Sequence, residues 1–118
     1  MRIKRSVHAR KKRRATLART KGFRGEANHN YKRAKEALLK AETYAYRDRR
    51  NRKRDFRRLW ITRINAAARL NGMSYSQLMH GMRLAGVELD RKVLADIAVR
   101  DPETFRRFAE TAREAAAA

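Results

Sequence analysis

The sequence contains no cysteine, which excludes a disulfide framework, thiolate metal sites and cysteine nucleophiles. We therefore expect a chain of the reducing cytosol. Proline occurs once, at Pro102, and glycine five times, so few positions can punctuate the chain. No stretch alternates polar and apolar residues as a half-buried strand does. These absences predict an all-α fold.

Long apolar runs are also missing. No segment approaches the roughly 18 apolar residues of a membrane span, and the start lacks the apolar part of a secretory signal. The Arg-rich start has the composition of an organellar transit peptide, but its basic character continues for dozens of residues. We expect neither a membrane segment nor a transit peptide.

Acidic residues are scarce in one half of the chain. Lys and Arg number 32 against 12 Asp and Glu, a net charge of +20. Residues 1–58 hold 23 of these cations and 5 acids, a net of +18, and residues 59–118 hold 9 and 7, a net of +2. Such charge favours a polyanionic partner. We predict a basic extension over residues 1–58, followed by a small globular helical domain over residues 59–118.

Helical spacing of apolar residues organises both parts. The segment Lys21–Gly25 contains two glycines and is predicted to bend the extension between two helices. From Glu26 nothing interrupts the pattern before Gly72, which allows one helix of about 45 residues and roughly 70 Å. That is longer than a small domain is wide, so its first part is expected to project or to lie along another molecule.

Three shorter helices carry local start and stop signals. Ser74 with Gln77 forms a capping box, and Gly86 ends that helix. Asp90 caps a helix over 91–100, whose predicted apolar stripe consists of Val93, Leu94, Ile97 and Ala98. Asp101 followed by Pro102 opens the last helix, which is predicted to turn Phe105, Phe108, Ala109 and Ala112 inward.

Residues 47–58, the basic run, hold eight cations in twelve positions: Arg47, Arg49, Arg50, Arg52, Lys53, Arg54, Arg57 and Arg58. At 100° per residue they occupy most of a helix circumference, leaving chiefly the sector of Asp48 and Asp55. A helix threaded between RNA segments requires that arrangement, because phosphates then surround it. The alternative is a solvated helix in which the two aspartates pair with Arg52 and Arg58.

Aromatic residues lie between the cations of the extension. Phe23, Tyr31, Tyr44 and Tyr46 are candidates for stacking on RNA bases, with local packing of Tyr44 and Tyr46 as the alternative. Trp60, where the extension meets the domain, is predicted to anchor the long helix in the core.

Catalytic patterns are absent from the sequence. The three histidines, His8, His29 and His80, are far apart, and no nucleophile-base set, phosphate loop or paired carboxylates occur. We expect no enzymatic activity, metal, cofactor or small-molecule substrate. A DNA-compacting protein would favour a repeated tail or a dimerising face, and a membrane-active helix would need a broad apolar face, neither of which is found.

Four blocks in order resemble the bacterial large-subunit ribosomal protein L20 family. They are Lys21–Gly25, the run YRDRRNRKRDFRRLWITRIN from Tyr46 to Asn65 with the preceding YAYRDR element from Tyr44, the SYS of Ser74–Ser76, and the DRKVLA of Asp90–Ala95. His80, where the family often has a small amide residue, departs from the pattern.

The resemblance implies a cytoplasmic protein of the large ribosomal subunit that binds its RNA directly and is needed for assembly, without taking part in peptide synthesis. Neighbouring large-subunit proteins would be further partners. In some members the C-terminal domain also binds the messenger that encodes it; here we would look to Arg63, Arg69, Arg83, Arg91 and Lys92. Together with the charge pattern, it predicts these RNA-contacting residues: Arg2, Lys4, Arg5, Arg10, Lys11, Lys12, Arg13, Arg14, Arg19, Lys21, Phe23, Arg24, Tyr31, Lys32, Arg33, Arg47, Arg49, Arg50, Arg52, Lys53, Arg54, Arg57, Arg58, Arg63, Arg91 and Lys92.

Overall fold

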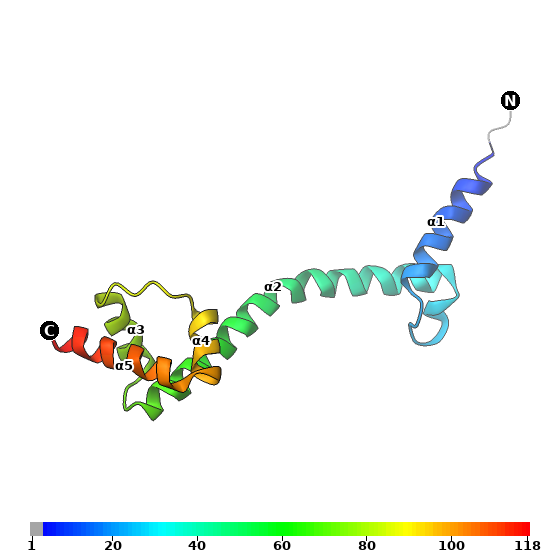
Figure 1. Cartoon of the computed structure of the whole chain (residues 1–118). Helices are drawn as coiled ribbons and strands as arrows, with labels where there is room; N and C mark the ends of the chain where they lie inside the picture. The colour runs from blue at the N-terminus through cyan, green and yellow to red at the C-terminus, as the bar shows by residue number, and fades with distance from the viewer. Residues whose placement is uncertain (1–3) are drawn as a thin grey trace. The chain divides into compact units, whose positions relative to one another are not determined.

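The computed structural model describes residues 4–118, and within them the chain is helical without a strand (Figure 1). The predicted all-α fold is confirmed. In chain order the elements are α1 (Ser6–Arg19), the 3-10 turn η1 (Gly25–Asn28), α2 (Tyr31–Leu70), α3 (Tyr75–Leu84), α4 (Arg91–Arg100) and α5 (Pro102–Ala117).

The chain divides into two compact units, a first unit up to Arg50 and a second unit from Asn51. The division falls inside α2, whose 40 residues supply helix to both units. It lies eight residues before the division between residues 58 and 59 that the charge pattern predicts. The division into an extension over residues 1–58 and a domain over residues 59–118 stays a prediction.

The predicted bend between two helices is confirmed in the first unit. Gly22 and Gly25 have φ of +84° and +71°, a left-handed backbone that side-chain-bearing residues rarely adopt. The long helix begins at Tyr31 rather than at Glu26. Asn30 explains the later start, because its side-chain oxygen accepts the Lys32 amide at 3.1 Å in the manner of an N-cap.

The first unit has almost no apolar core. Thr20 and Ala34 are its buried residues among those described, and α1 buries none. The Thr20 hydroxyl donates to the Leu17 carbonyl at 3.2 Å. An ion pair between Arg19 and Glu42 joins the end of α1 to the first half of α2. Burial alone therefore stabilises this unit little.

The three short helices of the second unit begin at the predicted caps. Ser74 and Gln77 form the reciprocal capping box. Asp90 accepts the Val93 amide at 2.7 Å, and Asp101 accepts the Thr104 amide at 3.1 Å, with Pro102 in the first turn of α5. Each carboxylate satisfies an amide that has no partner within its helix.

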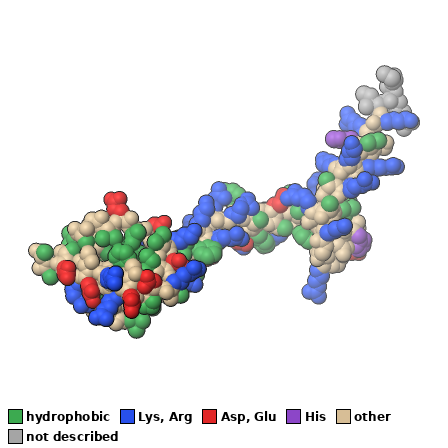
Figure 2. Space-filling view, in the orientation of Figure 1, with side chains coloured by type: hydrophobic (Ala, Val, Ile, Leu, Met, Phe, Trp, Pro, Cys, Tyr) green, Lys and Arg blue, Asp and Glu red, His purple; other side chains and the backbone are tan. Residues whose placement is uncertain are grey.

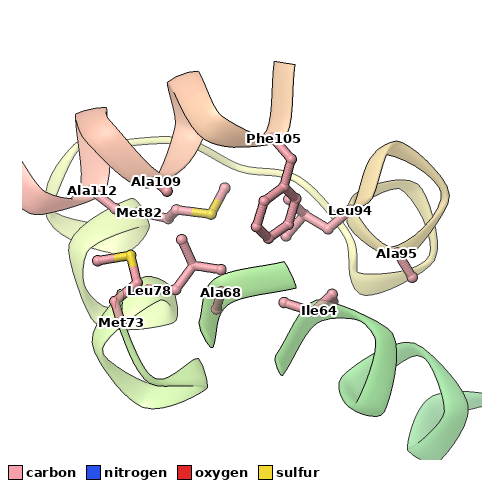
Figure 3. Packing of buried hydrophobic residues seen from close by; sticks show 10 residues of the cluster. All are labelled: Ile64, Ala68, Met73, Leu78, Met82, Leu94, Ala95, Phe105, Ala109 and Ala112. Atoms are coloured by element: carbon pink, nitrogen blue, oxygen red, sulfur yellow. The ribbon is translucent and has the colours of Figure 1, made fainter. Parts of the chain in front are cut away.

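The core of the second unit consists of small and medium side chains from α2 to α5. Phe105 is its largest fully buried side chain, and its ring lies beside Leu94 in Figure 3. The buried cluster is Ile64, Ala68, Met73, Leu78, Met82, Leu94, Ala95, Phe105, Ala109 and Ala112.

The predicted inward residues of α5 are confirmed, with Phe108 only half-buried. The predicted stripe of α4 is partly wrong: Val93 is 43% exposed, and Ala95 is buried in its place. Val93 and Ala95 lie at opposite edges of the α4 apolar face, and helical spacing alone allows either edge to turn toward the core. Trp60 packs half-buried against this core, as the prediction of an anchor requires.

Helices α3 and α5 cross at Gly81. A Cβ atom placed there would lie 2.7 Å from the Ala112 carbonyl carbon and 2.8 Å from the Ala112 Cβ, and closer still to the Ala112 carbonyl oxygen. Both are shorter than real Cβ contacts, so the crossing requires a residue without a side chain.

Candidate nucleic-acid interface

All eight cations of the basic run are exposed on α2. Since α2 is one uninterrupted helix, they point in most directions around its axis, as predicted. Figure 2 shows Lys and Arg side chains gathered along α1 and α2, whereas acidic side chains are most frequent among the helices of the second unit.

Ion pairs neutralise only a small part of the basic run. Asp55 lies 4.0 Å from Arg58, as in the solvated-helix alternative, but Asp48 pairs with Arg47 at 2.9 Å and not with Arg52. The hydrogen bond from Arg47 to Asp48, and the charge of that carboxylate, raise the pKa of the Arg47 guanidinium. Six cations of the run have no acidic partner within residues 4–118: Arg49, Arg50, Arg52, Lys53, Arg54 and Arg57.

The tyrosines before the basic run lie against cations of their own helix. The Tyr44 ring has Lys40 at 5.2 Å and Arg47 at 4.6 Å from its centroid, and Tyr46 has Arg50 at 3.8 Å. Such contacts hold a cation over the face of an aromatic ring. The local packing considered as an alternative is therefore present, and base stacking by these rings stays a prediction.

Most of the other predicted RNA-contacting residues are also exposed. Phe23, Tyr31 and Arg91 are half-buried, and Arg2 lies outside the described residues. Arg13 sits 5.5 Å from the Tyr31 centroid. The exposed ones outside the basic run are Lys4, Arg5, Arg10, Lys11, Lys12, Arg13, Arg14, Arg19, Lys21, Arg24, Lys32, Arg33, Arg63 and Lys92.

A hollow of about 500 Å³ opens beside α1 in the first unit. We call it the α1 hollow; it is lined by Arg10, Arg13, Arg14, Leu17, Ala18, Lys21 and Asn28. The sequence points to its four cations but not to Leu17, Ala18 or Asn28. Asn28 lies at the end of η1 and lines the hollow only because the chain folds back there. Helical periodicity does not connect η1 with α1, so the sequence does not predict this contact.

The second unit offers fewer cations, and several are engaged. Arg91 donates from Nε to the Tyr75 hydroxyl at 2.8 Å, and Arg100 pairs with Asp96 at 2.9 Å. Arg63 and Lys92 line a hollow of about 590 Å³ next to Trp60. Its rim mixes these cations with carboxylates, so its charge is less one-sided than that of the α1 hollow.

Two findings bear on other kinds of site. Within residues 4–118, no three His, Asp or Glu side chains gather in a way that could hold a metal ion. Among the helices of that same part of the chain, none combines the length and apolar character needed to cross a membrane.

Comparison with known proteins finds similarity along nearly the whole chain. A family model described as Ribosomal protein L20 matches residues 2–108. The large ribosomal subunit protein bL20 of Roseiflexus sp. (strain RS-1) is 60% identical over 114 residues, which cover 97% of each chain. The protein of that name from Roseiflexus castenholzii is 61% identical over 113 residues, 96% of this chain and 97% of the relative. That of Rubrobacter xylanophilus is 58% identical over 114 residues, 97% and 86% of the two chains.

Proposed function

Because the chain belongs to the ribosomal protein L20 family, we propose that it is a structural constituent of the large ribosomal subunit that binds the RNA of that subunit directly. The family is one of ribosomal structural proteins and not of enzymes. The chain accordingly acts in the bacterial cytoplasm, within the large subunit, as a component of the particle and not as a catalyst of peptide synthesis.

The observation that carries RNA binding is the set of unpaired cations around α2. Six exposed cations without a carboxylate partner, on a segment of twelve residues, repel one another in free solution. Phosphates on several sides relieve that repulsion and release their condensed counterions. Arginine predominates in the run, and its planar fork can hold a phosphate by two hydrogen bonds.

The near absence of a core in the first unit supports a role in assembly. A segment with so little burial is ordered chiefly by the contacts that it makes with a partner. The first unit would then order together with the RNA segments around it and hold them in one arrangement. The second unit, which has its own core, would dock on the RNA and on neighbouring large-subunit proteins.

Messenger binding by the second unit is a second candidate function, as in some members of the family. It is favoured by cations that the second unit exposes outside the basic run, among them Arg63, Arg69, Arg83 and Lys92. Through such binding the chain would repress translation from its own messenger.

The test of ribosomal RNA binding compares large-subunit RNA with random duplex DNA at equal salt. We expect tighter binding to the RNA and a steep loss of affinity with salt. Replacing Arg49, Arg50, Arg52 and Lys53 by alanine should reduce the salt slope by about 3, at roughly 0.7–0.9 per lost phosphate contact.

A control variant removes the same charge from the second unit at positions with no predicted RNA contact: Arg100, Arg106, Arg107 and Arg113 to alanine. It should change the slope less, because those residues lie outside the basic run and Arg100 and Arg106 pair with carboxylates. Equal affinity for RNA and duplex DNA, or equal slopes for the two variants, would contradict the proposal. Co-sedimentation of the chain with the large subunit through a moderate salt wash is the corresponding test in extracts.

A further inference from the structure

The α1 hollow combines features that neutralisation of phosphates alone does not require. Its lining residues on α1 follow helical spacing from Arg10 to Ala18 and thus share one face. Lys21 and Asn28 close it from the turn and from η1. Leu17 and Ala18 place an apolar surface among the cations. A flat row of cations would suffice for a duplex backbone, whereas a concave site with an apolar surface suits a planar ring.

The rim of the hollow is one-sided in charge. Neither Lys21 nor the three arginines Arg10, Arg13 and Arg14 pair with a carboxylate within residues 4–118. No acidic residue lines the hollow. The similar-sized hollow beside Trp60, by contrast, has Asp90 and Asp96 in its lining. The α1 hollow is therefore the one whose electrostatics favour an anion.

Asn28 adds a polar group with defined hydrogen-bonding capacity. Its side-chain oxygen lies 2.6 Å from Nδ1 of His29, so the oxygen is the end of the amide that contacts the histidine. The amide nitrogen has no partner within the described residues and keeps two donors. Donors of this kind can hydrogen-bond the carbonyl oxygens and ring nitrogens of a nucleobase.

We propose that the α1 hollow binds a single unpaired nucleotide of the RNA, with its base on Leu17 and Ala18 and its phosphates on the surrounding cations. The volume of about 500 Å³ lies within the roughly 300–1,000 Å³ typical of sites for small ligands. The inference rests on the proposed RNA-binding function and deepens it. The first unit then recognises a bulged or extruded nucleotide as well as neutralising phosphates.

The test uses the full chain and two RNA hairpins that differ by one bulged 2-aminopurine. At a salt concentration that weakens phosphate contacts, the bulged hairpin should bind about tenfold more tightly, the gain expected from burying roughly 55 Å² of apolar surface at about 25 cal/mol per Å². Binding should also change the fluorescence of the bulged 2-aminopurine as it leaves the RNA stack. Equal affinity for the two hairpins would overturn the inference.

Matched variants assign any preference to the hollow. Leu17→Gln keeps the charge and the approximate size of the side chain but removes the apolar contact, so the preference for the bulged hairpin should fall to about onefold or twofold. Asn28→Ala should also reduce the preference for the bulged hairpin, because it removes the amide donors that would hydrogen-bond the base. Val7→Gln is the control: Val7 is 65% exposed on the same helix and does not line the hollow, so the preference should persist. Loss of preference in the control, or its persistence in Leu17→Gln, would refute the assignment.

Two further results separate this inference from the proposed function. If large-subunit RNA binds more tightly than duplex DNA while both hairpins bind equally, only the nucleotide site fails. If large-subunit RNA shows no advantage over duplex DNA, the proposed function fails first. A third result concerns the free nucleotide. If free adenosine monophosphate binds as tightly as the bulged hairpin, the hollow is a site for a free nucleotide, and its assignment to RNA is overturned.

Discussion

Replacing Gly81 by alanine should destabilise the second unit by about 2–3 kcal/mol. The new Cβ would lie 2.7 Å from the Ala112 carbonyl carbon, and reaching an ordinary contact of 3.4 Å requires α3 and α5 to separate by at least about 0.7 Å. Overpacking of a core typically costs about 1–3 kcal/mol and occasionally more. We expect a cost of about 3–4 kcal/mol here, because the backbone atoms of Ala112 cannot rotate away as a side chain would. The higher helix propensity of alanine returns about 1 kcal/mol.

Urea or thermal unfolding of the full chain measures this change through fluorescence of Trp60, the one tryptophan, which packs against the affected core. The midpoint should fall by roughly 10–20 °C for a unit of this size. Ser76→Ala, an exposed change on the same helix, should stay within about 0.5 kcal/mol. Ala112→Gly should fail to rescue Gly81→Ala, because the carbonyl group of residue 112 remains. A variant as stable as the parent would refute the close-crossing argument.

In the free chain, amide exchange from α1 to about residue 45 should be much faster than in α3–α5, because α1 buries no residue; uniform protection would contradict this. Hydrogen bonds that Thr104 donates from its side chain and its backbone lower the pKa of the Asp101 carboxyl. Asp101 therefore stabilises α5 above its ordinary pKa of about 3.9 and loses that effect as the pH falls through the lower folded value. The thermal midpoint of the parent should therefore approach that of Asp101→Asn only in the acid range. If the difference between the two midpoints is constant down to about pH 2, this role of the Asp101 carboxylate is disproved.

Features that depend on neighbours in sequence could be predicted from the sequence. The caps at Ser74, Asp90 and Asp101 are set by one side chain and the amides two or three positions later, so the helix starts follow from spacing. The interruption at Gly22 and Gly25 follows from the same local reasoning. The start of α2 at Tyr31 had a signal too, in Asn30, which the uninterrupted apolar pattern obscured.

Features that depend on distant partners could not be predicted in this way. Nothing near Gly81 in sequence announces that Ala112 approaches it, and nothing near Val93 says that α4 turns Ala95 inward instead. The same holds for the candidate site. Charge density identifies the cations, but the hollow that joins Leu17 to Asn28 exists only through the turn between them.

The contrast between the two units also has a temporal side. Synthesis proceeds from the N-terminus, so the 23 cations of residues 1–58 emerge before the residues that enclose Phe105 have been added. At about 5–20 residues per second, the remaining 60 residues take some 3–12 seconds. During that interval the nascent chain is a tethered polycation without a finished core. The nascent chain can therefore bind a polyanion before the second unit has folded. Transfer from that polyanion to the large-subunit RNA then depends on how fast the early contacts dissociate.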